Sequence, residues 1–80
     1  MTHFDAIARV LAETGNVSGD EARIILTSFR HEFPAPDYLD RKLSENEIDI
    51  TIDLYRKNQS LIKWISQVLA KQNQIPAPKP

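Results

Sequence analysis

Most hydrophobic positions of this chain recur every three or four residues, which is the spacing of one face of an α-helix. In the first segment, residues 2–14, the apolar stripe consists of Phe4, Ile7, Ala8 and Leu11. Thr2 is a suitable N-terminal cap for this segment. Gly15 lies where helices commonly end with a residue in the left-handed conformation. The pattern therefore predicts a first helix over residues 2–14.

A second helix is predicted from a start signal at residues 17–22. Ser18 and Glu21 have the spacing of a capping box, and Val17 can pack on Ala22. The apolar face of this helix consists of Ala22, Ile25, Leu26, Phe29 and Phe33. Pro34 ends the helix, because proline cannot donate a backbone hydrogen bond and restricts the residue before it. Residues 34–37 then form a stiff connection, after which Asp37 caps a short turn that carries Leu39 and Leu43.

The stretch EIDITIDLY, residues 47–55, alternates apolar and polar side chains, which by period alone indicates a β-strand. No other segment alternates over a similar length, so a strand here would need a second copy or the edge of a partner's sheet. A helix needs no such neighbour. Acidic residues come early and basic residues late, as a helix dipole favours, and Ser44 and Glu47 form another capping box. We therefore predict a helix, whose alternating pattern gives it a wide apolar surface.

The helical interpretation places two adjacent apolar stripes along residues 48–69. One stripe consists of Ile48, Ile52, Tyr55, Ile62 and Leu69. The other stripe consists of Ile50, Leu54, Leu61, Ile65 and Val68. Asn58 can end one helix and Ser60 can cap the next. The sequence leaves open whether residues 44–72 are one long helix or two shorter ones.

These elements predict an all-α fold, a small bundle of three to five helices with its longest element at about residues 44–72. Residues 1–72 are expected to form a single helical domain, and the proline-rich residues 73–80 a flexible, extended tail. A chain of 80 residues has a small core, and proteins of this size often gain stability from a partner.

Composition indicates where in the cell the protein is expected to occur and which classes of partner it is not expected to bind. The chain has no cysteine and a net charge of −1. It has no apolar run long enough for a membrane span and no visible signal peptide. We therefore expect a cytoplasmic protein without a membrane partner. The net charge argues against a general affinity for nucleic acid.

Residues with catalytic potential are sparse in this sequence. His3 and His31 lack the spacing of metal ligands, and His31 is near the end of a predicted helix, where it can neutralise carbonyl groups. Asp49 and Asp53 are four residues apart, without a third ligand, as is typical of a solvated helix face. The nucleophile, phosphate-loop and zinc motifs of enzymes are missing. We predict no enzymatic activity, no cofactor, no metal and no small-molecule substrate.

The wide apolar surface of residues 48–69 predicts a non-enzymatic protein–protein interaction module. An adaptor, an inhibitor or antitoxin-like regulator and a self-assembling subunit all fit this description, and the partner is another protein or a second copy in a homodimer. The candidate interface consists of Ile48, Ile52, Tyr55, Ile62 and Trp64. Trp64, the only tryptophan, either covers the edge of the core or, if exposed, anchors a partner.

Two short stretches resemble known families. LSENEI at residues 43–48, with LYRKNQSLIKWI at residues 54–65, resembles the opening of resolvase-type helix-turn-helix domains. This resemblance implies a small DNA-binding regulator whose hairpin at residues 44–70 contacts phosphates. Its candidate contacts are Arg56, Lys57, Lys63 and Lys71. The sequence departs from that family at residues 72–78, where glutamine, asparagine and proline replace the expected recognition helix.

The heptapeptide LYRKNQS, residues 54–60, is also similar to a segment of type III secretion needle subunits. Those subunits are helical hairpins joined by a proline-containing loop. The resemblance implies a self-assembling subunit, although the first 20 residues of this chain carry an additional amphipathic helix.

Overall fold

The computed structural model describes the backbone of residues 1–74 and the side chains of residues 1–72, and this part of the chain is all helical. The four α-helices are α1 (His3–Gly15), α2 (Gly19–Phe29), α3 (Ile48–Lys57) and α4 (Gln59–Gln74). Three 3-10 turns, η1 (Arg30–Glu32), η2 (Pro36–Asp40) and η3 (Glu45–Glu47), lie between α2 and α3. The predicted fold class is thus confirmed. The tail is predicted over residues 73–80, but α4 extends to Gln74, and residues 75–80 lie outside the described residues.

The ends of α1 show one prediction confirmed and one corrected. Thr2 caps the helix, and its side chain and that of Asp5 form a reciprocal capping box. The left-handed residue at the other end is Asn16, with φ of 54°, and not Gly15. Asparagine tolerates this conformation better than most residues. Gly15 serves close packing instead, because a Cβ atom at this position would lie 2.8 Å from Cδ2 of Leu69 in α4.

Helix α2 begins where the sequence indicates, since Oγ of Ser18 accepts a hydrogen bond from the backbone N–H of Glu21. Its last part differs slightly from the prediction. The α-helix ends at Phe29, and η1 continues as a tighter turn to Glu32, just before Phe33 and Pro34. The proline therefore ends the helical segment as predicted, although the final turn is a 3-10 turn.

The alternating stretch EIDITIDLY is helical, with Glu47 ending η3 and Ile48 beginning α3. The predicted capping box of Ser44 and Glu47 does not form, because Ser44 precedes a 3-10 turn and its side chain makes no capping bond. Residues 44–72 thus contain two α-helices, α3 and α4, and not one long helix.

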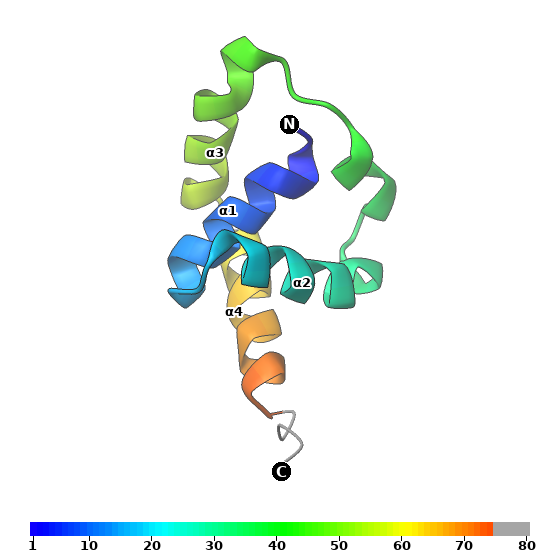
Figure 1. Cartoon of the computed structure of the whole chain (residues 1–80), viewed down its shortest axis with the longest axis vertical. Helices are drawn as coiled ribbons and strands as arrows, with labels where there is room; N and C mark the ends of the chain where they lie inside the picture. Colours follow the sequence, from blue (N-terminus) through cyan, green and yellow to red (C-terminus); the bar gives the residue numbers. More distant parts are fainter. Residues whose placement is uncertain (75–80) are drawn as a thin grey trace.

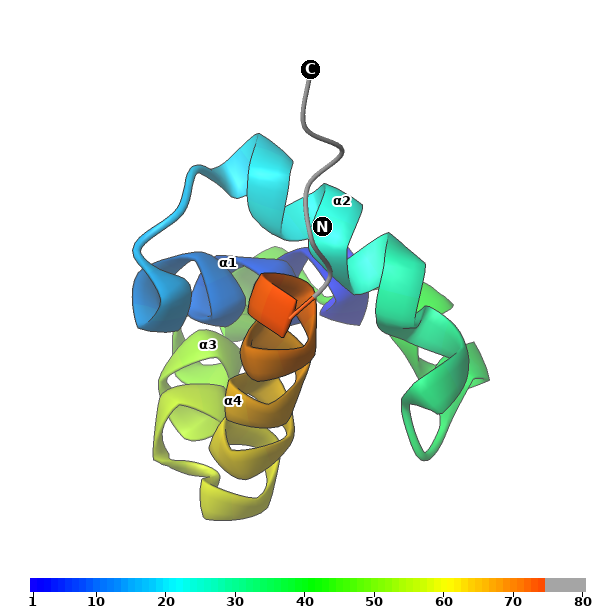
Figure 2. The same ribbon diagram turned by 90° about the horizontal axis from the view of Figure 1, so that it is seen from below.

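Asn58 separates α3 from α4. Its backbone leaves the helical conformation, with φ of −79° and ψ of 102°. Its Oδ1 accepts a hydrogen bond from the N–H of Leu61, so Asn58 rather than Ser60 caps α4. One residue thus ends the first helix and begins the second, labelled α3 and α4 in Figure 1, and the chain changes direction there (Figure 2).

The core lies where α1 crosses the other helices. Helix α1 packs against α2, α3 and α4, whereas α2 and α3 do not pack against each other within the described residues. Figure 2 shows α2 on one side of α1 and α4, and α3 on the other. The most deeply buried large side chains are Ile7, Val10, Leu11, Leu26, Leu39, Ile65 and Val68. Every α-helix therefore has one face in a common core, and its outer face determines what a partner can contact.

Candidate functional site

In the structure, the predicted interface residues of α3 and α4 face the core. Ile52 is only 2% exposed. Four further residues of that set are partly buried and pack against the core: Ile48, Tyr55, Ile62 and Trp64. In this conformation the five side chains stabilise the bundle and present little surface to another molecule.

Trp64 covers the edge of the core, which was one of its two predicted roles. Its ring meets the ring of Phe33 edge to face, with ring centroids 5.3 Å apart and an interplanar angle of 86°. Phe33 follows η1 and Trp64 is in α4, so this aromatic pair holds the end of the α2 segment against α4.

Tyr55 belongs to a polar cluster that joins three parts of the chain. Its phenol oxygen is hydrogen-bonded to Nδ1 of His3 at 2.6 Å. The His3 ring packs on the ring of Tyr38, with centroids 4.3 Å apart, and the guanidinium of Arg41 lies over the same tyrosine. Backbone hydrogen bonds between residues 1–3 and 41–43 tie the chain together beside the cluster. The cluster therefore fastens the η2 connection to α1 and α3.

Ionisation of this cluster is shifted toward the neutral forms. Burial and the positive charge of Arg41 lower the pKa of His3, while Glu47 raises it by a smaller amount. Burial and the neighbouring Tyr38 raise the pKa of Tyr55. Both groups thus favour their uncharged forms at neutral pH, as a structural contact requires.

We expect the stability of the protein to fall as pH decreases through and below about 6.5, the ordinary pKa of histidine. In the unfolded chain His3 takes up its proton first, since its pKa in the folded protein is lower. The contribution of His3 is therefore complete above pH 6.5 and is lost toward the lower, folded-state pKa. Urea unfolding at pH 5 to 8 should show a weaker decrease for His3→Gln than for the unchanged protein. Equal decreases would contradict this role.

The outer face of α3 carries two large apolar side chains in solvent. Ile50 is 62% exposed and Leu54 is 61% exposed. They are four residues apart and therefore adjacent on successive turns. We refer to Ile50 and Leu54 as the outer ridge. Figure 1 shows α3 at the edge of the molecule.

Acidic residues are concentrated in the segment that carries the outer ridge, and Lys57 lies on the same side of α3 as the ridge. Exposed Glu45, Glu47 and Asp49 make no ion pair within the described residues, and Asp53 pairs with Lys57 at 2.9 Å. No basic residue occurs between Lys42 and Arg56. Residues 43–55 therefore carry four acidic side chains and no basic one, although the whole chain is nearly neutral.

Ile24 of α2 is the other strongly exposed aliphatic residue of the described chain, at 67%. It is not part of the outer ridge, because α1 and α4 separate α2 from α3 (Figure 2). A single exposed apolar side chain is common on protein surfaces. Ile24 thus provides a matched control for substitutions in the outer ridge.

Three of the four candidate nucleic-acid contacts take part in ion pairs within the chain. Arg56 donates two hydrogen bonds to the carboxylate of Glu13, of 2.8 and 2.7 Å. This pairing raises the pKa of Arg56 and lowers the pKa of Glu13. Lys57 pairs with Asp53, and Lys71 pairs with Glu32. Lys63 is the one candidate that forms no ion pair with the side chains of residues 1–72.

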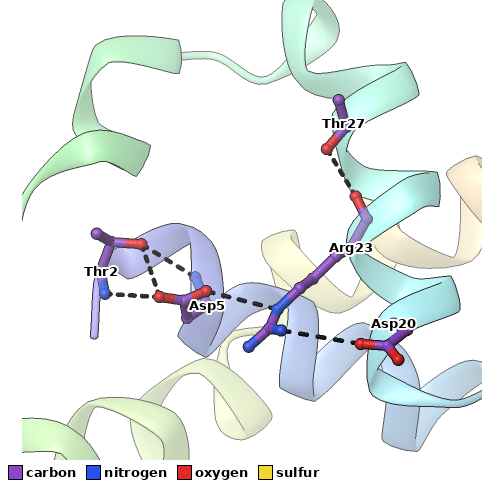
Figure 3. A network of polar contacts seen from close by, with 5 residues as sticks. All are labelled: Thr2, Asp5, Asp20, Arg23 and Thr27. Carbon is purple, nitrogen blue, oxygen red and sulfur yellow. Dashed lines mark hydrogen bonds and ion pairs between the residues drawn. The ribbon is translucent and has the colours of Figure 1, made fainter.

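A shallow groove of about 350 Å³ runs along α1 beside the start of α2. Small residues such as Ala8 and Ala12 line it together with charged residues of both signs. Figure 3 shows part of the charged lining, in which Asp5 joins the cap of α1 at Thr2 to Arg23 of α2. Arg23 also lies 4.0 Å from Asp20. The charged side chains of the lining are two acidic, Asp5 and Glu13, and two basic, Arg9 and Arg23, so they balance one another.

The described residues contain no group of three or more histidine, aspartate or glutamate side chains placed to hold a metal ion. Among the described helices, none has the length and apolar character that a membrane crossing requires. Comparisons of the chain with protein-family models, with curated proteins and with solved structures found no match.

The sequence contains a local signal for the outer ridge in the charged residues of α3. Ile50 and Leu54 share their side of α3 with Asp53 and Lys57, which lie three residues after each of them. Ile48, Ile52 and Tyr55 occupy the opposite side. Within α3 alone, these charged residues favour solvent for the side of Ile50 and Leu54. They do not identify a solvent-facing stripe, because Leu61, Ile65 and Val68 of the same stripe are buried in α4.

Proposed function

We propose that this chain is a small non-enzymatic protein-interaction module that contacts its partner through the outer ridge. The observation that carries the proposal is the exposure of Ile50 and Leu54, at 62% and 61%, on adjacent turns of a well-packed helix. Covering the exposed parts of both side chains would contribute about 2–3 kcal/mol to an association. An adaptor, an inhibitor or antitoxin-like regulator and a self-assembling subunit remain the fitting roles.

The interaction proposal is favoured over a DNA-binding regulator by the ion pairs of the basic side chains. Arg56, Lys57 and Lys71 each have a carboxylate partner within the chain, and a phosphate would have to replace it. The acidic residues around α3 would also repel a phosphate backbone. The needle-like assembly subunit is a special case of the proposal in which the partner is another copy.

The test compares the double variant Ile50→Ser, Leu54→Ser with the control Ile24→Ser. We expect the free energy of unfolding to change by no more than about 0.5 kcal/mol in either variant, because all three side chains are exposed. Affinity purification of stoichiometric partners, with molar mass measured across a range of protein concentrations, then reports on association. The double variant should lose the association that the control keeps.

Two results would contradict the proposed function. The first is an unchanged set of partners and an unchanged molar mass in the double variant. The second is an equal loss of association in the double variant and in Ile24→Ser, because the outer ridge would then have no special role.

A further inference from the structure

We infer that the outer ridge binds a positively charged amphipathic helix of another protein. This inference rests on the proposed function and adds the chemistry of the partner. It is drawn from the acidic residues in the segment of the ridge, from the shape of the ridge and from the poor fit of a second copy.

The acidic residues in the segment of the outer ridge favour a cationic partner. Four acidic residues lie within residues 45–53, at Glu45, Glu47, Asp49 and Asp53, and only Asp53 has a basic partner within the described chain. The dipole of α3 favours acidic residues near its N-terminus. It does not account for two exposed aliphatic side chains among them. A partner with lysine or arginine beside apolar residues would cover the ridge and neutralise these carboxylates at the same time.

The shape of the surface favours a helix as the partner. Ile50 and Leu54 form a row with a spacing of four residues, and such a row fits the groove between side-chain rows of another helix. The described residues contain no strand, so they offer no sheet edge for an extended peptide. An amphipathic helix with apolar residues three and four positions apart supplies the complementary groove.

A second copy of this chain fits the ridge poorly. In an antiparallel two-fold pairing centred between Ile50 and Leu54, Asp53 of each copy lies on the same flank of the contact, since a helix advances by about 100° per residue. The two carboxylates would approach each other near the axis. The other exposed aliphatic residue, Ile24, follows Asp20 by one turn and precedes Thr27 and Ser28, so it offers no basic apolar face.

The experiment uses two synthetic helical peptides with the same leucine stripe. One peptide carries lysine on both flanks of the stripe, and the other carries glutamate at the same positions. Binding of each fluorescein-labelled peptide to the full chain is measured by anisotropy, with protein concentrations up to about 1 mM because the interface is small. We expect the lysine peptide to bind at least about tenfold more tightly at low salt, and the difference to shrink at about 0.5 M salt.

Matched variants identify the carboxylates responsible. The triple variant Glu45→Gln, Glu47→Gln, Asp49→Asn should remove most of the preference for the lysine peptide. The control Asp20→Asn, Glu21→Gln, Asp37→Asn changes the net charge by the same amount at exposed positions outside α3 and η3. The control should keep the preference. The double variant Ile50→Ser, Leu54→Ser should weaken binding of both peptides.

The possible outcomes separate the inference from the proposed function. Equal binding of both peptides, lost in the ridge double variant, overturns the cationic partner and leaves the ridge as an interface. Binding of neither peptide overturns the inference, while the affinity purification still decides the proposed function. Self-association that the ridge double variant abolishes would show that a second copy covers the ridge, against this inference.

Discussion

Replacing Ile65 by alanine should lower the free energy of unfolding by about 3–4 kcal/mol, the largest effect that we expect from a single truncation. Ile65 is fully buried in α4, and its truncation removes apolar contacts and leaves a cavity in the packed interior. Native proteins in general have total stabilities of roughly 5–15 kcal/mol, and domains with one small core lie at or below the lower end of this range. The variant should therefore retain its helices only at low temperature and low denaturant concentration.

Urea unfolding followed by circular dichroism measures this effect. Ser66→Ala is the matched control, because Ser66 is the exposed neighbour of Ile65 in the same helix. The control should change stability by no more than about 0.5 kcal/mol. A loss below about 1 kcal/mol for Ile65→Ala would mean that α4 is not packed into the core as described.

Replacing Trp64 by alanine should lower the free energy of unfolding by about 2 kcal/mol. The value is below that of a fully buried tryptophan because Trp64 is only partly buried. The loss arises from its packing on the core and from its edge-to-face contact with Phe33. Trp64→Phe keeps an aromatic ring at this position and should recover about half of the loss.

The measurement is again urea unfolding by circular dichroism, which does not depend on the fluorescence of the substituted tryptophan. A binding defect in Trp64→Ala would not show whether Trp64 touches the partner, because the substitution also alters the packing of the core. The outer-ridge variants are free of this ambiguity, because they alter exposed side chains. If Trp64→Ala had unchanged stability, Trp64 would not cover the edge of the core, and it would again be a candidate interface residue.

Several elements of the fold could be predicted because their causes are local. Thr2 with Asp5 and Ser18 with Glu21 start α1 and α2 through contacts made within one turn. Pro34 ends the second helical segment through the restriction on its own backbone and on the residue before it.

The predictions that needed correction depended on more distant contacts or on small differences between conformations. Asn16 rather than Gly15 takes the left-handed position, since both residues tolerate it. The glycine is used instead at the crossing of α1 with Leu69 of α4, which no local pattern indicates.

The candidate site could be predicted only in part. The sequence placed a wide apolar surface on residues 48–69 and separated it into two stripes. It did not show which stripe faces the core. The buried residues come from both stripes: Ile52 comes from one, and Leu61, Ile65 and Val68 come from the other.

Buried residues come from both stripes because the helix is broken at Asn58. A stripe continues along a helix only while the residues keep a constant rotation of about 100°. Asn58 leaves the helical conformation, so α4 presents a different face to α1 than an unbroken helix would. The sequence by itself determined the helical class, the caps and the apolar positions of this protein. Only the tertiary structure decided that Ile50 and Leu54 remain in solvent, because that outcome depends on how α1 covers the opposite side of α3.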